Sequence, residues 1–263
     1  MNLSPRAQIV AEVLALWLFT NLAIRQVLWI HEATGLHEIV LAAIPVAFMY
    51  APVALCHWRK VDPWSYPMHL PAFSDRAAWR AAVGQAGLWV GAIAVPFMVG
   101  YHFWETKLFR HFPGDGIPEL PAGLDSVGDG FADAAKFALL AGYLWPIVSG
   151  GLQLVGYHLF FAGLPEEIFY RGYLQSRLDE TFGTPWRVLG APLGWGWLIT
   201  CVIFAAGHDI VSLKWWHFAI FFPSLVFGWL RARTGGIVAG ALFHAWCNIT
   251  VSTLDALYGV NGP

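Results

Sequence analysis

Charged residues are scarce in this chain. Asp, Glu, Lys and Arg make up 12% of its 263 residues, whereas hydrophobic residues make up 57% and the mean hydropathy is +0.55. A typical soluble domain is about 25% charged, so an ordinary soluble protein is excluded. The net charge is −2, whereas nucleic-acid-binding proteins usually carry an excess of basic residues. We therefore predict an integral membrane protein of the all-α class, surrounded by lipid and without a nucleic-acid partner.

Cysteine is equally scarce. The three cysteines, Cys56, Cys201 and Cys247, lie in apolar surroundings and show no Cys-x-x-Cys spacing. An odd count without that spacing argues against a disulfide framework. We interpret all three as small buried apolar residues.

Long apolar runs fill most of the sequence. A helix needs about 20 mostly apolar residues to span a membrane. Pro146 and Gly150-Gly151 either separate two of the runs or kink one long helix, so we predict seven or eight spans around an intramembrane polar cavity. We treat 1–263 as one membrane domain, with variable helices in 1–150 and a motif-bearing core in 152–257. The candidate spans are 7–30, 37–56, 77–103, 132–150, 152–178, 188–208, 214–232 and 235–257.

Loop charges indicate sidedness. The connector 57–76 is basic and rich in Trp, whereas 104–131 is rich in Gly, Pro and acidic residues. By the positive-inside bias, 57–76 faces the cytoplasm and 104–131 the outside. Seven spans also place the arginines near 171–187 and 231–233 inside, which favours that count.

Two adjacent carboxylates, Glu166 and Glu167, interrupt an apolar run, and Arg171 follows the second by four residues. An ionisable group in hydrocarbon costs about 2.5–3.5 kcal/mol on insertion scales, so such groups pair, face water or perform chemistry. Residues four apart share a helix face, so Glu167 and Arg171 can pair. Glu166 points about 100° away and stays available as a general base. A charge cluster that caps a helix at the membrane surface is the alternative.

Two histidine clusters follow. His208 ends Phe204-Ala-Ala-Gly-His208, whose small residues allow another helix or a substrate to approach closely. His244 and Asn248 are four apart and share a face of the last run. An imidazole and an amide can donate to a developing oxyanion. An interhelical hydrogen bond is the structural alternative for this pair.

Taken together, Glu-Glu-x-x-x-Arg, Phe-x-x-x-His and His-x-x-x-Asn on successive apolar segments closely resemble the CAAX prenyl endopeptidase and bacterial Abi (bacteriocin-processing) family of intramembrane proteases. The resemblance covers residues 160–252. It implies a polytopic helical bundle, in the bacterial cytoplasmic membrane for that branch, that cleaves a peptide bond near the membrane.

The resemblance also implies roles for single residues. Glu166 would activate water, His208 would hold or polarise that water, and His244 with Asn248 would stabilise the oxyanion. Glu167 and Arg171 would support the site. The family has been described both as metal-dependent and as metal-free. Whether the site holds a zinc ion therefore stays open. The ligands of such an ion would be Glu166, His208 and His244.

Signatures of other intramembrane proteases are absent from the sequence. His31-Glu32 and His37-Glu38 are followed by Gly35 and Leu41 where a His-Glu-x-x-His metal site needs histidine. A Gly-x-Ser-Gly serine motif and a pair of intramembrane aspartates are also missing. The non-catalytic alternatives are a scaffold or bacteriocin-immunity protein of the same fold and a small transporter, although a transporter usually shows internal repeats.

The expected substrate is a membrane-anchored or membrane-proximal protein or peptide. A prenylated tail, a C-terminal sorting signal and a bacteriocin precursor all remain open.

Overall fold

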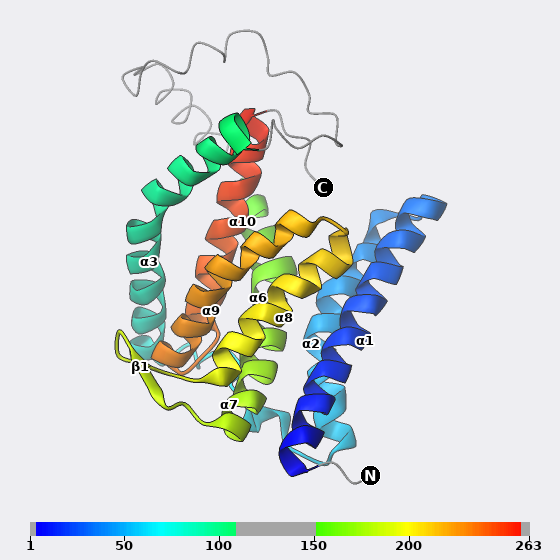
Figure 1. Cartoon of the computed structure of the whole chain (residues 1–263), viewed down its shortest axis with the longest axis vertical. Helices are drawn as coiled ribbons and strands as arrows, with labels where there is room; N and C mark the ends of the chain where they lie inside the picture. The colour runs from blue at the N-terminus through cyan, green and yellow to red at the C-terminus, as the bar shows by residue number, and fades with distance from the viewer. Residues whose placement is uncertain (1–3, 109–150, 259–263) are drawn as a thin grey trace. The chain divides into compact units, whose positions relative to one another are not determined.

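The structure, a computed structural model, describes residues 4–108 and 151–258 (Figure 1). These residues are mostly helical, as predicted. They fall into two compact units. Unit 1 contains Met1–Trp89 and Leu159–His244, and unit 2 contains Val90–His158 and Ala245–Pro263. Unit 1 thus joins the N-terminal helices to the segment that carries the motifs.

The N-terminal helices have clear start and stop signals. Helix α1 (Pro5–Thr34) begins after Ser4, whose hydroxyl accepts a hydrogen bond from the Ala7 amide, and it ends at Gly35 in the left-handed conformation. A 3₁₀ turn over Glu38–Ala42 leads into α2 (Ala43–Trp58), a short turn covers Pro63–Ser65, and α3 (Arg76–Phe103) continues as a π turn over Trp104–Leu108.

The carboxylate motif lies on a helix with unusual winding. From Gly151 to Phe182 the chain stays helical but alternates α and π segments, and π segments are often found at functional sites. Every residue of the second π segment is buried. The segments are α5 (Gly151–Tyr157), π His158–Gly163, α6 (Leu164–Glu167), π Ile168–Gln175 and α7 (Ser176–Phe182).

A small antiparallel hairpin follows, which the apolar pattern of the sequence does not predict. Strands β1 (Trp186–Val188) and β2 (Ala191–Leu193) pair through a two-residue turn. Both turn residues, Leu189 and Gly190, have positive φ, as such tight turns require. The expected start of a span at 188 is therefore wrong, because α8 begins at Trp195 and runs to Ser212.

The predicted span 214–232 is divided. A 3₁₀ turn covers Trp215–Ile220, and α9 runs over Phe221–Thr234. Pro223 has no amide hydrogen to donate, so it is tolerated only in the first turn of α9. The last helix, α10 (Val238–Tyr258), matches the predicted 235–257 closely and crosses from unit 1 into unit 2.

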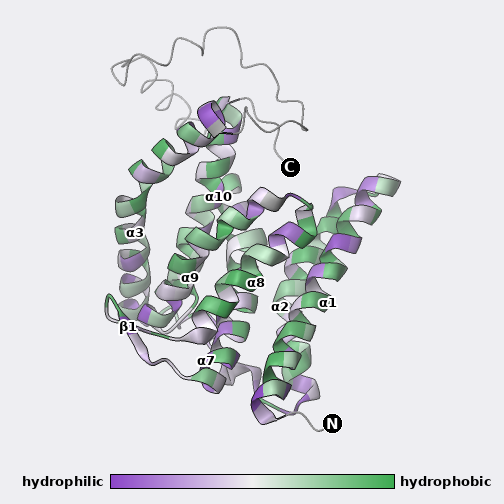
Figure 2. Cartoon of the chain, in the orientation of Figure 1, coloured by the Kyte–Doolittle hydropathy of each residue, from purple (hydrophilic) through white to green (hydrophobic). Residues whose placement is uncertain are grey.

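Four helices in the described residues are long and apolar enough to cross a membrane, which indicates an integral membrane protein. Figure 2 shows apolar residues along these helices. Large apolar side chains such as Phe19 and Val46 are more than half exposed at the protein surface. The count of seven or eight spans stays a prediction, and the expected span 132–150 lies outside the described residues. The four candidates are Pro5–Thr34, Glu38–Trp58, Arg76–Lys107 and Trp195–Ser212.

Within unit 1 the motif helix lies at the centre. Helices α2, α8 and α9 contact its buried π segment, and α1 contacts α7 and α8. At the end where α1 begins, Glu12 accepts hydrogen bonds from Arg59 and from the Tyr173 hydroxyl, and Arg177 lies 3.5 Å from the same carboxylate. These contacts fix the N-terminal helices against the motif helix.

Candidate active site

Glu167 and Arg171 form a fully buried ion pair. Arg171 Nη1 lies 3.3 Å from Glu167 Oε1, and neither side chain is exposed, which confirms the predicted pairing. Arg171 Nη2 donates to the Ser224 hydroxyl at 2.8 Å. The guanidinium carbon lies 4.2 Å from the centre of the Phe204 ring and 5.1 Å from that of Phe227. Because both charges are removed from water, each depends on the other for compensation.

Glu166 presents one carboxylate oxygen to two imidazoles. Glu166 Oε2 lies 3.8 Å from His208 Nε2 and 3.9 Å from His244 Nε2. The oxygen is buried and has no hydrogen-bond partner. The two distances are too long for direct hydrogen bonds but suit a bridging water. Three residues predicted from separate motifs thus come together, and the intramembrane cavity expected around them stays a prediction.

The hydrogen bond that each histidine makes through Nδ1 determines its tautomer, and therefore whether its Nε2 atom presents a lone pair to Glu166. His208 Nδ1 lies 3.0 Å from the Phe204 carbonyl, which can only accept, so Nδ1 carries the hydrogen. His244 Nδ1 lies 3.2 Å from Glu167 Oε1, a carboxylate paired with Arg171, and the same reasoning applies. In the neutral rings both Nε2 atoms are therefore acceptors. Three acceptors facing one another are unfavourable, and either a bridging water or a proton on one imidazole would supply a donor.

Aromatic rings fix both imidazoles. The His244 ring stacks on Phe227, with centroids 4.5 Å apart and an angle of 10°. Phe204 contacts the His208 ring at 4.7 Å and lies edge-on to His244 at 5.8 Å. The side chain of His208 is 29% exposed, compared with 14% for Glu166 and 5% for His244. Access to the cluster is therefore from the His208 side.

Asn248 lies one helical turn beyond His244 on α10, in unit 2. Its part in the site therefore stays a prediction. Glu166, Glu167, Arg171, His208 and His244 all lie in unit 1.

Asn21, like Ser224, is a buried polar residue near the cluster that the sequence motifs do not include. Asn21 on α1 is 1% exposed, and its side-chain amide donates to the Trp17 carbonyl at 2.8 Å. It also lies 3.3 Å from the Tyr170 hydroxyl. The Tyr170 ring packs edge-on against Phe204 at 4.8 Å, and the Phe204 carbonyl holds His208. Asn21 is thus connected to His208 indirectly, by successive contacts through Tyr170 and Phe204. An amide in an apolar run was the signal that could have found it.

Gly207 allows this close approach, as its small size predicts. A Cβ added at Gly207 would lie 2.6 Å from the Tyr170 hydroxyl and 2.8 Å from Asn21 Oδ1. We expect Gly207→Ala to destabilise the protein by about 1–3 kcal/mol, because overpacking a buried contact forces its neighbours to move. Thermal and denaturant unfolding in detergent measure this change.

Gly84 on α3 provides the matched control, because a Cβ there meets nothing within 4 Å. Ala is favoured over Gly in a helix by about 0.8–1.0 kcal/mol, so Gly84→Ala should be neutral or stabilising. Equal effects of the two substitutions would show that Gly207 does not hold the contact.

The distances around Glu166 bear on the open question of a metal. Two ligands of a tetrahedral zinc with bonds of 2.0–2.1 Å lie about 3.4 Å apart, which is closer than Glu166 Oε2 is to either imidazole. In the described part of the chain, no group of three or more His, Cys, Asp or Glu side chains is arranged to hold a metal ion. The conditional ligand set Glu166, His208 and His244 therefore does not fit a metal as placed, and we derive no step through one.

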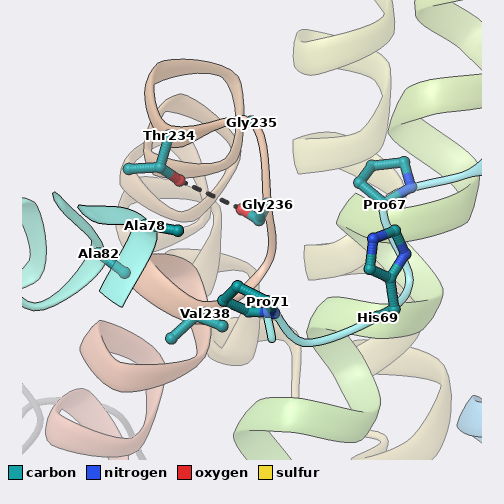
Figure 3. A pocket seen from close by; sticks show the side chains of 9 residues that line it. All are labelled: Pro67, His69, Pro71, Ala78, Ala82, Thr234, Gly235, Gly236 and Val238. Carbon is teal, nitrogen blue, oxygen red and sulfur yellow. Dashed lines mark hydrogen bonds between the residues drawn. The ribbon is translucent and has the colours of Figure 1, made fainter. Parts of the chain in front are cut away.

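A separate small hollow of about 120 Å³ lies beside the turn between α9 and α10. Figure 3 shows His69 and Pro67 on one side and the turn with Thr234, Gly235 and Gly236 on the other, where the Thr234 hydroxyl donates to the Gly236 carbonyl at 3.3 Å. Its lining includes no carboxylate, so it does not form a second site of the same kind.

Comparison with known proteins bears on the segment that carries all three motifs. Residues 148–250 match the type II CAAX prenyl endopeptidase Rce1-like family. The match confirms the resemblance predicted from the motifs. The Rce1-like segment includes every predicted site residue and excludes α1 to α3. No curated protein and no solved structure matches the chain.

Proposed function

We propose that this protein is an intramembrane endopeptidase in which Glu166 activates a water molecule for attack on a peptide bond near the membrane. The observation that carries the proposal is the buried, unpartnered Glu166 Oε2, which faces the Nε2 atoms of His208 and His244. The Rce1-like match supports a hydrolase of the CAAX type.

Each group of the cluster has a defined task. A water between the three acceptors donates one hydrogen to Glu166 and the other to an imidazole, which leaves an oxygen lone pair free to attack. Glu166 takes the proton as the water attacks the carbonyl carbon. His208 orients the water, and its Nδ1–H bond to the Phe204 carbonyl keeps the ring in place. The protonated Glu166 then gives that proton to the amide nitrogen as the C–N bond breaks, so that the leaving group departs as a neutral amine.

Oxyanion stabilisation is assigned to His244 and Asn248. The neutral His244 ring faces the site as an acceptor. It becomes a donor on taking up a proton from solvent, which is separate from the proton that Glu166 takes from the water, and Glu167 at 3.2 Å stabilises the resulting charge. The Asn248 amide would supply the second donor.

The proposed substrate is the C-terminal tail of a membrane-anchored protein, cleaved to remove a processing or sorting signal. The substrate is identified by comparing membrane proteomes from cells that carry the gene and cells that lack it. A polypeptide whose C-terminus shifts when the gene is removed would be the expected result. If no terminus shifts while another protein loses its membrane location or abundance, the scaffold alternative is favoured instead.

A chelator should leave the cleavage rate unchanged, because the atoms around Glu166 are too far apart for a metal site. The test uses purified protein in liposomes with the identified substrate, before and after prolonged treatment with EDTA. The same chelator saturated with zinc is the control for effects on the membrane. Loss of cleavage that returns when zinc is added would contradict this expectation and establish a metal-dependent reaction.

A further inference from the structure

A basic and aromatic surface lies at the start of α3. Phe73, Arg76, Trp79 and Arg80 line an open hollow of about 490 Å³. Both arginines are exposed, and 92% of Phe73 is uncovered. We call these four residues the α3 entry surface. None of them takes part in the candidate active site.

The two arginines lack a carboxylate partner among the described residues. Three buried or half-buried arginines are neutralised, Arg59 by Glu12, Arg171 by Glu167 and Arg231 by Asp179. At the α3 entry surface, the nearest acid in sequence, Asp75, instead accepts a hydrogen bond from the Ala78 amide and caps the helix.

Two cations without a counter-charge are unfavourable for the helix at this position. Arg76 and Arg80 are four residues apart, so they repel each other across one helix face. They also occupy the first turns of α3, where the helix dipole favours negative charge. An anion bound between them would relieve both effects.

The aromatic part of the surface is already ordered. Trp79 Nε1 donates to the Ala72 carbonyl at 3.2 Å, and the Trp79 ring stacks on Phe73 with 6.3 Å between centroids and an angle of 9°. This apolar pair lies where the apolar stretch Arg76–Lys107 begins. Tryptophan beside the end of a spanning helix is typical of the headgroup level of a bilayer.

We propose that the α3 entry surface binds the phosphodiester headgroup of an anionic glycerophospholipid. The guanidinium groups of Arg76 and Arg80 match the geometry of phosphate oxygens. The exposed Phe73 and the Trp79 ring contact the glycerol and upper acyl region. A free phosphate would use the arginines and leave this apolar pair in water, so charge and apolar surface together favour a lipid.

Native mass spectrometry of the purified full-length protein in detergent tests the proposal, with phosphatidylglycerol, phosphatidylcholine and inorganic phosphate as probes. We expect wild type to bind phosphatidylglycerol in preference to phosphatidylcholine. The double variant R76Q/R80Q should bind phosphatidylglycerol about thirtyfold more weakly, since each arginine near an anionic surface contributes about fivefold. The Phe73→Ala variant should also bind it more weakly while keeping both charges.

The double variant R187Q/R233Q is the matched control, because it removes two other exposed arginines. Its affinity for phosphatidylglycerol should equal that of wild type. Melting temperatures confirm that each variant is folded. Unchanged lipid affinity in R76Q/R80Q would overturn the proposal. So would inorganic phosphate that displaces phosphatidylglycerol at equal concentration, because the surface would then be a phosphate site without a lipid preference.

Discussion

Replacing Glu166 with Gln is expected to abolish cleavage while the protein folds as before. Gln keeps the size and one carbonyl oxygen of the side chain but cannot take a proton from water. General-base catalysis contributes about 10²–10⁴-fold, so a loss of that size is expected in the rate at saturating substrate. The measurement is the rate in liposomes, together with the melting temperature in detergent. Because Glu166 Oε2 has no hydrogen-bond partner, the substitution removes no structural contact there.

Glu180 offers a matched control for Glu166→Gln. Its carboxylate pairs with Arg177 on the same helical path, and its side chain is 52% exposed. Glu180→Gln should leave the cleavage rate unchanged, since an exposed pair contributes little. If Glu166→Gln retained the wild-type rate, Glu166 would not be the base. A scaffold protein would show the same insensitivity at both positions.

The second large effect is expected for stability at Arg171. Replacing Arg171 with Met leaves the buried Glu167 carboxylate without its counter-charge, with only the hydrogen bond from His244 Nδ1 remaining, and removes the guanidinium from the Phe204 ring. Breaking a buried ion pair from one side costs about 3–5 kcal/mol, which is a large part of the stability of a typical domain. Denaturant unfolding in detergent and the yield of folded protein measure the loss.

The double variant E167Q/R171M separates loss of pairing from loss of packing. Neutral replacement of both partners removes the uncompensated charge, so it should be more stable than R171M alone. The amide oxygen that replaces the Glu167 carboxylate would still accept a hydrogen bond from His244 Nδ1. The destabilisation of the double variant is therefore expected to be smaller than the sum of the destabilisations of E167Q and R171M. Strictly additive effects would show that Glu167 and Arg171 do not depend on each other.

The central residues of the site could be predicted from the sequence, because residues four apart in a helix lie on the same face whatever the rest of the fold. The four-residue spacing of Glu167 and Arg171 predicts their pairing, and the 3.3 Å contact confirms it. The order of the motifs predicts the convergence of Glu166, His208 and His244, since ionisable groups in apolar helices must find one another or water. Their catalytic roles, and the role of Asn248, remain predictions.

Other features depend on contacts that spacing does not encode. Asn21 lies far from Tyr170 in the sequence, and only the packing of α1 against α8 brings it to the site. The alternation of α and π winding around Glu166 is not indicated by the apolar pattern of the sequence. Gly190 and Pro192 are residues typical of turns and could have indicated the hairpin before α8. Because the run around them is apolar, the pattern predicts a membrane span instead.

Single-turnover cleavage in water labelled with heavy oxygen tests most directly whether Glu166 activates water. With the substrate identified from the proteome comparison, mass spectrometry locates the label after one turnover. Direct attack by water places heavy oxygen in the new carboxylate of the product and none in the Glu166 side chain. Heavy oxygen in the Glu166 carboxylate, with an unlabelled first product, would show that Glu166 attacks the peptide itself and would contradict the proposed role.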